Sequence, residues 1–314
     1  MKILVTGGAG FIGSHIADAY IALGHNVHIL DNLSSGKMEN VNNQAKFIKL
    51  DLNSPELKDF LLSEKFDIIS HQAAQMNVRV SVDDPVYDAM NNIIGSLNLY
   101  EAARLSGVKK IIFASSGGTV YGEQDYFPAD EEHPTRPCSP YGISKLTNEK
   151  YLFYYKTVYN LDYVSLRYGN VYGLRQNPHG EAGVVAIFIN KMLSGEQPVI
   201  NGDGFITRDY IYIDDVVRAN IIALQNEVTG IFNVTTGVET NVNFIFKKLK
   251  ELTGSDCKEF HGPPKAGEQR RSVCSYDKFF RLHGWKPETE FSKGLELTVE
   301  KVRQSYNKNI KRTN

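Results

Sequence analysis

Residues 3–13 read Ile3-Leu4-Val5-Thr6-Gly7-Gly8-Ala9-Gly10-Phe11-Ile12-Gly13, and they are the strongest indication of the fold class. Its first three residues are apolar and predict a strand, and the residues from Phe11 onward predict an amphipathic helix. The glycines between them have the G-x-G-x-x-G spacing, and Gly7 also makes the variant with a glycine at every third position. A side chain there would keep the backbone away from a pyrophosphate, whose charge the free N–H groups and the helix dipole can meet. The stretch therefore predicts a dinucleotide site.

Asp31 ends the second predicted strand, about 20 residues after the glycines. A carboxylate at that place can hydrogen-bond the hydroxyl groups of an adenosine ribose. It would also repel a 2′-phosphate, and no arginine stands beside it in the sequence. The sequence therefore favours NAD over NADP.

Short apolar segments alternate with helical stretches through the first half of the chain. The segments are Ile3–Val5, Val27–Leu30, Phe47–Leu50, Ile68–Ser70, Ile111–Ala114 and Tyr163–Leu166. Because parallel strands need crossover connections, this alternation predicts an α/β fold with a doubly wound, Rossmann-type parallel sheet. From about Gly169 the loops lengthen, which predicts a smaller, irregular α/β lobe. We expect an NAD-binding domain over residues 1–168 and a mainly substrate-binding lobe over 169–314, with parts of 214–234 returning to the first domain.

The charge balance argues against a polyanionic partner. The chain has 35 Lys and Arg against 36 Asp and Glu, so no overall positive charge exists to hold nucleic acid or an anionic membrane. Its three cysteines and scattered histidines lack the spacing of a metal or redox site. Met1 leads directly into the first strand without the series of a signal peptide, and no apolar run is long enough to span a bilayer. We expect a cytoplasmic protein without a metal.

Tyr141 and Lys145 stand four positions apart on a predicted helix, which places a phenol and an ammonium group on one face. Their ordinary pKa values, about 10 and about 10.4, suit neither group to base work at neutral pH. Lys145, together with the positive ring of an oxidised nicotinamide, would lower the pKa of Tyr141. We expect Tyr141 to act as a base in one direction and as an acid in the other. The serine-rich segment Phe113–Gly122 offers hydroxyl groups at a strand end to orient the reacting oxygen.

These residues resemble the extended short-chain dehydrogenases and, within them, the UDP-glucose (UDP-galactose) 4-epimerases, over nearly the whole length of the chain. The matching motifs are Thr6–His15, Asp31–Leu33, Asp51–Leu52, His71–Gln75, Asn92, Ser115–Gly122, Pro140–Lys145, Arg167–Gly173, Gly202–Gly204 and Arg208–Val216. The resemblance implies tightly held NAD that removes hydride from C4 of a UDP-hexose while Tyr141 takes the 4-hydroxyl proton. The 4-ketose would then turn over and receive the hydride on its other face.

The same resemblance implies roles for individual residues. The NAD-binding set is Gly7, Gly10, Phe11, Ile12, Gly13, Asp31, Asn32, Asp51, Leu52, Gln72, Ala73, Ala74, Gln75, Asn92, Ser115, Tyr141, Lys145 and Tyr168. The set expected to bind the UDP-sugar is Ser116, Tyr141, Asn170, Val184, Val185, Val199, Asn201, Arg208 and Arg271. Arg208 would lie on the diphosphate, because a planar guanidinium forms charge-assisted bonds to phosphate oxygens.

The position of the active-site hydroxyl departs from the family pattern. The usual Ser or Thr falls on Gly117, counted back from Val120-Tyr121-Gly122. We expect Ser116 to take its role, with Ser115 or Thr119 as alternatives.

Two further departures lie in the second lobe. Lys265 stands where an arginine is expected ahead of Gly267-Glu268, which leaves Arg270 or Arg271 for the diphosphate. Ser272 stands where glucose-restricted members can carry a bulky Tyr. The smaller residue leaves room for an N-acetyl group, so UDP-GlcNAc and UDP-GalNAc could also be accepted.

Three other functions compete with this interpretation. Sugar-nucleotide 4,6-dehydratases need an acidic pair where this chain has Gly118-Thr119, and their mechanism is excluded. UDP-glucuronate decarboxylases and 4-epimerases stay open, because Lys265, Arg270 and Arg271 could pair with a C6 carboxylate. A non-catalytic NAD(H)-sensing regulatory protein is the alternative of another class, although such proteins usually lack the proton-transfer pair.

The helix that follows Tyr141 is unusually aromatic. It carries Tyr151, Phe153, Tyr154, Tyr155 and Tyr159. At helical spacing such residues most often belong to the core. The family resemblance adds a second interpretation, a homodimer in which this helix and the one from about Pro85 to Ser106 pack against their copies.

Overall fold

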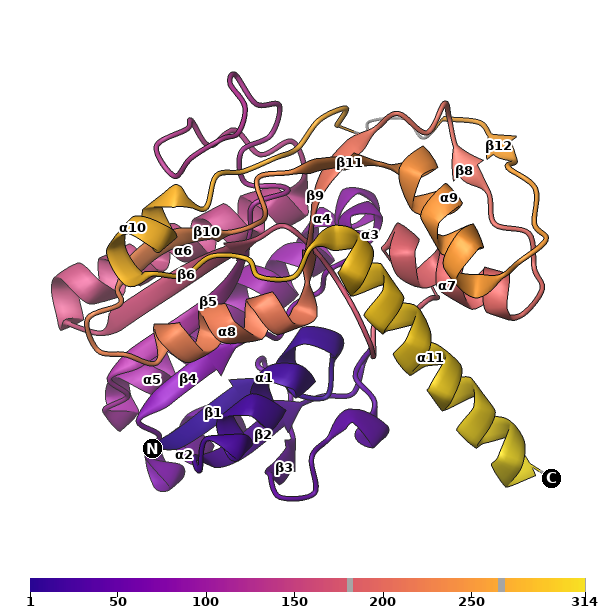
Figure 1. The fold of residues 1–314 in the computed structure, drawn as a ribbon. Coiled ribbons are helices and arrows are strands. Elements are labelled where there is room, and N and C mark those ends of the chain that lie inside the picture. The colour runs from indigo at the N-terminus through magenta and orange to yellow at the C-terminus, as the bar shows by residue number, and fades with distance from the viewer. Residues whose placement is uncertain (180–182, 265–268, 314) are drawn as a thin grey trace.

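The computed structural model describes residues 1–179, 183–264 and 269–313. Its main sheet has seven parallel strands in the order β3-β2-β1-β4-β5-β6-β10 (Figure 1). The strands are β1 (Lys2–Thr6), β2 (Asn26–Asp31), β3 (Lys46–Lys49), β4 (Ile68–His71), β5 (Lys110–Ser116), β6 (Asp162–Tyr168) and β10 (Gly230–Val234). The order reverses direction between β1 and β4, so the doubly wound α/β fold predicted from the sequence is confirmed.

Helices cover both faces of this sheet (Figure 1). One layer contains α1 (Phe11–Ala22) and α8 (Ile213–Ala223), which pack on each other. The other contains α2 (Glu56–Glu64), α5 (Gly95–Ser106) and α6 (Pro140–Tyr159).

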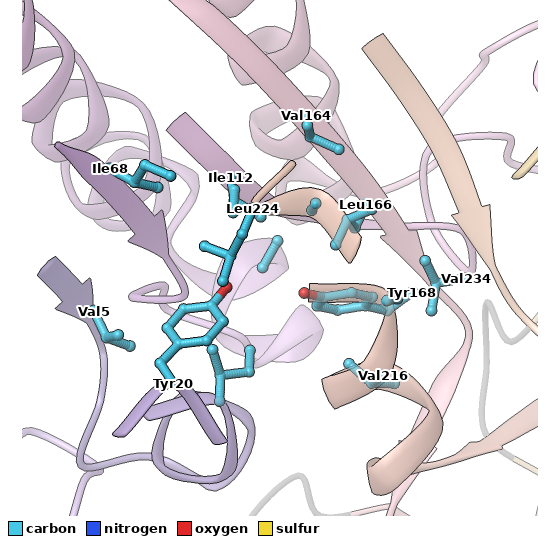
Figure 2. Close-up of a cluster of buried hydrophobic side chains, with 14 of the residues drawn as sticks. Val5, Tyr20, Ile68, Ile112, Val164, Leu166, Tyr168, Val216, Leu224 and Val234 are labelled. Atoms are coloured by element: carbon cyan, nitrogen blue, oxygen red, sulfur yellow. The ribbon is translucent and has the colours of Figure 1, made fainter. Parts of the chain in front are cut away.

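Alternation along the strands divides the apolar residues between two cores. Ile3 and Val5 of β1 face α1 and α8, and Leu4 between them faces α2 and α5. Figure 2 shows the first core, where Tyr20 of α1 meets side chains from neighbouring strands and from α8. The strand residues labelled there are Val5, Ile68, Ile112, Val164, Leu166, Tyr168 and Val234. Continuous apolar strands are what a sheet buried on both sides requires.

A second lobe lies beyond the carboxyl ends of the main strands. It contains a sheet of β7 (Asn170–Tyr172), β9 (Thr207–Tyr212) and β11 (Glu239–Asn241), and a small sheet of β8 (Ile200–Asn201) and β12 (His261–Gly262). Its helices are α7 (Val184–Leu193), α9 (Val242–Thr253) and α11 (Phe291–Thr313). Their apolar faces, with Phe188 and Phe246 in edge-to-face contact, form a separate core.

The chain passes between the two lobes more than once. After β9 it returns through α8 and β10, and β10 pairs with β6 in the main sheet. It then leaves through β11 and returns again to α10 (Asp277–His283), which packs against β10. A division between residues 168 and 169 stays a prediction.

The helix expected from about Pro85 to Ser106 consists of three consecutive segments. They are α4 (Pro85–Ala89), the π-helical η2 (Met90–Ile94) and α5. Asp84 caps α4 by accepting a hydrogen bond from the N–H of Tyr87. The short helices η1 (Met38–Asn40) and α3 (Val78–Asp83) complete the fold. A π segment inside an α-helix often accompanies a functional site, and η2 contains Asn92.

The core interpretation of the aromatic helix is wrong for four of its five residues. Tyr155 is buried, but Tyr151, Phe153, Tyr154 and Tyr159 are all exposed. Tyr155 faces α5, where its hydroxyl donates to Glu101 at 2.6 Å. The exposed ring of Tyr159 also contacts α5, through Arg104. The helical periodicity of the sequence showed that this part of α6 is apolar, but it did not show whether another part of the chain packs against it.

Within the described part of the chain, no helix is both long and apolar enough to cross a bilayer.

Candidate active site

The loop between β1 and α1 is built so that only glycine fits at two positions. Gly7 has φ +67°, and a Cβ on it would lie 2.6 Å from the backbone nitrogen of Ala73. A Cβ on Gly13 would lie 2.3 Å from the carbonyl oxygen of Gly7. Gly10 begins α1 without a side-chain cap, and no acidic residue stands in the first turn. The first amides of the helix are thus left to an anion, which fits the pyrophosphate of a dinucleotide.

Asp31 connects this loop to the next one. Its carboxylate is buried and accepts hydrogen bonds from the N–H of Ala9, at 3.0 Å, and from the N–H of Leu33, at 2.8 Å. The side chain of Asn32 donates to Asp51 at 2.6 Å. Asp31, Asn32, Asp51 and Leu52 are thereby placed together beyond β2 and β3. This is the place where the adenosine end of a dinucleotide lies in a doubly wound sheet.

The segment after β4 is fixed by bonds to its neighbours. The N–H of Ala73 donates to Thr6 Oγ1 at 3.3 Å. Gln75 and Asn92 exchange two hydrogen bonds of 2.8 Å, so the π-helical η2 is tied to this segment. The hydroxyl of Tyr168, at the end of β6, donates to Gln72 at 3.4 Å. The carboxyl ends of β4 and β6 are therefore surrounded by one group of predicted NAD-binding residues, namely Gln72, Ala73, Ala74, Gln75, Asn92 and Tyr168.

Tyr141 and Lys145 lie on the first turns of α6. Ser139 caps this helix through its Oγ and Pro140 follows at the first helical position, which explains why the helix begins there. The ammonium group of Lys145 donates to the carbonyl oxygen of Ala114 at 2.8 Å. It lies 4.8 Å from the centre of the Phe113 ring and 5.6 Å from that of the Tyr141 ring. Helix α6 thus brings both groups to the end of β5.

Burial is the main cause of the pKa shifts of this pair in the chain by itself. Burial lowers the pKa of Lys145 to about 8. Burial also raises the pKa of Tyr141, and the carboxylate of Asp88 raises it further. The lowering expected for Tyr141 depends on the positive ring of an oxidised nicotinamide as well as on Lys145. In the chain by itself, desolvation of the phenolate is the largest cause, and it keeps the pKa of Tyr141 above its ordinary value.

The three candidate hydroxyl groups have different surroundings. Ser115 is buried and donates to Glu149 at 2.6 Å. Thr119 Oγ1 is buried without a hydrogen-bond partner, and Ser116 is partly exposed at the end of β5. A Cβ on Gly117 would lie 3.2 Å from the carbonyl oxygen of Arg167, so a side chain at the position of the usual Ser or Thr would require a shift of a few tenths of an ångström.

Ser116 and Asn170 approach the same point. A methyl group on Gly118 would lie 3.6 Å from Asn170 Oδ1 and 4.0 Å from Ser116 Oγ. The absence of a side chain at Gly118 therefore leaves space between them. Ser116 and Asn170 are brought together on the second-lobe side of the strand ends.

The remaining candidates for sugar binding come from the second lobe. Val185 is 1% exposed and its side chain packs in the core of that lobe, so its contribution to a site is limited to the backbone. Val199, 38% exposed, precedes β8, which contains Asn201. Val184 begins α7 and is partly buried. Arg208, on β9, donates from Nη1 to the carbonyl oxygen of Thr207 at 2.8 Å.

Arg271 is already paired within the chain. Its guanidinium forms an ion pair of 2.6 Å with Glu239 and stacks on the ring of Phe127, 3.8 Å from its centre. The backbone carbonyl oxygen of Arg270 accepts a hydrogen bond from the N–H of Thr207. Lys265, Gly267 and Glu268 lie outside the described residues. Ser272, at the position linked to N-acetyl tolerance, is buried.

Two buried acids next to the site were missed by the sequence reasoning. Asp88 of α4 accepts three hydrogen bonds beside Asn92, and Glu149 of α6 pairs with Arg167 of β6. Each stands four positions from a predicted site residue, Asp88 before Asn92 and Glu149 after Lys145. That spacing on one helix face was the available signal.

Comparison with known proteins shows similarity over nearly the whole chain. The chain matches the family described as NAD dependent epimerase/dehydratase over residues 3–235. A putative UDP-glucose 4-epimerase from Methanocaldococcus jannaschii is 47% identical over 297 residues, which are 95% of this chain and 97% of that protein. Among solved structures, a UDP-glucose 4-epimerase from Thermotoga maritima with UDP-glucose has 48% identity and a TM-score of 0.95, covering 98% of this chain and 100% of that one. One from Thermus thermophilus in complex with NAD has 45% identity and a TM-score of 0.92, covering 96% and 99%.

Proposed function

Because the chain belongs to the NAD-dependent epimerase/dehydratase family, we propose that it is an NAD-dependent UDP-glucose 4-epimerase, which inverts C4 to interconvert UDP-glucose and UDP-galactose. The observation that carries the proposal is the placement of Tyr141 and Lys145 at the end of β5, beside the Gln75–Asn92 pair. Relatives at 44–48% identity over nearly the full length carry the same activity in their names. An epimerase needs this combination of a dinucleotide cradle and a proton-transfer pair.

Tyr141 is the group that moves the proton of the 4-hydroxyl. Bound NAD would supply reversible hydride acceptance from C4 and, in its oxidised form, a positive charge near the phenol. Lys145 supplies a second positive charge, held in place by Ala114 and Phe113. Two neighbouring positive charges would offset the cost of burying the phenolate. They would therefore lower the pKa of Tyr141 toward the working pH, where the phenolate can act as a base.

The NAD-binding roles of the residues at the strand ends belong to this proposal. The glycine loop and the start of α1 would hold the pyrophosphate. Asp31 with Asn32 would contact the adenosine ribose, Asp51 with Leu52 the adenine, and Lys145 the nicotinamide ribose. Gln72 to Gln75, Asn92, Ser115 and Tyr168 would line the middle and the nicotinamide end.

The sugar-nucleotide roles are proposed in the same way. Ser116 supplies the hydroxyl that orients the 4-oxygen, since Ser115 already donates to Glu149. Asn170, Val184, Val199, Asn201 and the backbone of Val185 line the nucleotide-sugar site. Arg208 binds the diphosphate, and Arg271 joins it by exchanging its bond to Glu239 for one to a phosphate oxygen.

We also propose that two copies of the chain form a dimer through the outer side of α6, α4 and η2. Ile143, Tyr151, Tyr154 and Val158 form a stripe at helical spacing on α6, and all are exposed. Val86, Met90 and Ile94 form a second exposed stripe on α4 and η2, which pack against α6. A shallow hollow lined by Thr147, Lys150, Tyr151 and Tyr154 lies on the first stripe. Two apolar stripes on neighbouring helices suit a four-helix interface with a second copy.

The function is tested by incubating the purified protein with UDP-galactose, UDP-GalNAc and UDP-galacturonate separately, without added NAD, and resolving the products. We expect UDP-glucose from UDP-galactose, with bound NAD carried through purification. Tyr141→Phe should lose this activity while it retains NAD. Interconversion of the uronate alone would overturn the substrate assignment. Unchanged cellular function of the Tyr141→Phe variant would favour the sensing protein instead.

A further inference from the structure

Asp88 is a fully buried acid whose carboxylate accepts hydrogen bonds from three donors. Its Oδ1 accepts from Gln75 Nε2 at 3.0 Å and from Asn92 Nδ2 at 2.8 Å. Its Oδ2 accepts from the hydroxyl of Ser144 at 2.6 Å. An ionised carboxylate is an acceptor only, so this set of three donors is the environment that suits its charged form.

These bonds join three segments that carry residues of the proposed cofactor and proton-transfer site. Gln75 follows β4, Asn92 lies in η2, and Ser144 lies on α6 next to Lys145. Gln75 and Asn92 are bonded to each other as well. On the other side, the N–H of Tyr141 donates to Ser81 of α3 at 3.2 Å. The start of α6 is therefore held against the cofactor-side loop through Asp88.

The charge of Asp88 acts on both members of the proton-transfer pair. Burial lowers the pKa of Lys145, and Asp88 raises it in part. Burial raises the pKa of Tyr141, and Asp88 raises it further. Asp88 thus favours the ammonium form of Lys145 and disfavours the phenolate form of Tyr141.

The other titratable groups packed around α6 have different partners. His71 of β4 has its pKa lowered to about 3 by burial and by Lys145, so it is neutral. Tyr100 of α5 donates to Asn148 at 2.8 Å. Glu149 is paired with Arg167 of β6, and Arg79 and Asp83 of α3 are exposed. Tyr87 of α4 is exposed as well.

We propose that Asp88 is a positioning residue for the epimerase reaction, whose buried carboxylate fixes α6 against the Gln75–Asn92 pair and supplies the negative charge that faces Tyr141 and Lys145. This inference rests on the proposed function, because it concerns the same proton transfer. It adds a residue that does not contact the substrate but sets the pH range in which the pair works.

The test separates the charge of Asp88 from its bonds. Asp88→Asn keeps the shape and removes the charge, and Ser144→Ala removes one bond and keeps the charge. For the holoenzyme we expect both limbs of the kcat–pH profile of Asp88→Asn to move to lower pH by about 1 unit, since loss of the acid lowers both pKa values. Ser144→Ala should lower kcat without moving either limb of the kcat–pH profile.

A second readout does not require turnover. The ultraviolet difference absorbance between a protein and its Tyr141→Phe counterpart, followed against pH, reports ionisation of the Tyr141 phenol. In the Asp88→Asn background this titration should also move to lower pH, even if the substrate assignment fails. Asp88→Ser removes the same charge and serves if Asp88→Asn does not fold. Profiles of the neutral variants that superimpose on the parent, or an equal displacement in Ser144→Ala, would overturn the proposal.

Discussion

Glu149 of α6 and Arg167 of β6 form a buried ion pair, with Arg167 Nη2 2.7 Å from Glu149 Oε2 and side chains 1% and 4% exposed. Ser115 donates to the same carboxylate at 2.6 Å, and Arg167 Nη1 donates to the hydroxyl of Tyr121 at 2.8 Å. The helix that carries Tyr141 is thereby joined to the ends of β5 and β6. The pair holds the framework of the site without occupying it.

Removal of one partner should be costly, because the other is left as a buried, uncompensated charge. We expect Glu149→Gln to lower the free energy of unfolding by about 3 kcal/mol. Urea denaturation at neutral pH measures the change. The matched control is Asp125→Asn, which breaks the exposed pair with Arg136 and should cost less than about 1 kcal/mol. Equal losses in the two variants would show that burial of the first pair has no energetic effect.

The assignment of the active-site hydroxyl predicts different kinetics for neighbouring serines. Ser116→Ala should lower kcat about 100-fold, the usual cost of losing a donor to a reacting oxygen. Ser115→Ala should keep most of the activity, because its hydroxyl is directed to Glu149. Steady-state rates with UDP-galactose measure both. If Thr119→Val loses more than Ser116→Ala, the unpartnered hydroxyl of Thr119 has the role instead.

Glycine in the nucleotide loop can be tested by adding one carbon. Gly13→Ala would place its Cβ 2.3 Å from the carbonyl oxygen of Gly7, so the loop must shift and the purified protein should lose its NAD. Gly118→Ala is the control, since its nearest neighbour would be 3.6 Å away, at Asn170 Oδ1. That variant should retain NAD. Absorbance and chromatography of nucleotide released by denaturation give the content, and full retention in Gly13→Ala would contradict the proposed pyrophosphate site.

Lys145 should make the stability of the protein depend on pH. Its folded pKa of about 8 lies below the ordinary value of about 10.4. Below pH 8 Lys145 is buried in its charged form, which lowers the free energy of unfolding by about 3 kcal/mol. Between the folded and the unfolded pKa the unfolded chain binds more protons than the folded one, so this loss of stability becomes smaller as the pH rises.

Lys145→Met should therefore be stabilised relative to the parent at pH 7, and this advantage should shrink as the pH approaches 10. Urea denaturation across that range measures the difference between the two proteins. Lys247→Met, at an exposed position of α9, is the matched control, because its side chain is not buried on folding and no stabilisation of this kind is expected. A constant difference for Lys145→Met would contradict the lowered pKa.

The dimer proposal predicts that one charge on the outer side of α6 separates the copies. Tyr151→Glu should give a monomer in light scattering coupled to gel filtration, because a buried, unpaired carboxylate is costly at an apolar interface. Leu282→Glu changes an equally apolar, exposed residue on α10 and should leave the dimer intact. A parent protein that is already monomeric would overturn the proposal.

The sequence predicted the main sheet well because its signals are local. The six strands expected in the first half all occur, each within two residues at either end, and their apolar runs match burial on both faces. The return of residues 230–234 beside β6 also had a local signal, a strand after an amphipathic helix.

The parts that escaped prediction depend on contacts between distant segments. Ser115 and Ser116 are adjacent residues of the same type, so the sequence does not show which hydroxyl faces the substrate. In the structure, the position of Glu149 on α6 distinguishes them, because the hydroxyl of Ser115 donates to it. Asp88 looks like an ordinary polar residue of a helix until Gln75, Asn92 and Ser144 are placed around it. Tyr151 and Tyr155 share one helix, yet only the latter meets α5.

The late return of β10 to the main sheet has a consequence for synthesis on the ribosome. Until residue 234 has emerged, β6 has no outer neighbour, and its amides and carbonyls form an open edge on a nascent chain. The first part of the second lobe, from β7 to β9, must be translated in the meantime. Nascent chains in which β10 has not left the ribosome should therefore recruit chaperones or aggregate more than chains from which residue 234 has emerged, and ribosome-bound arrest products can show this difference.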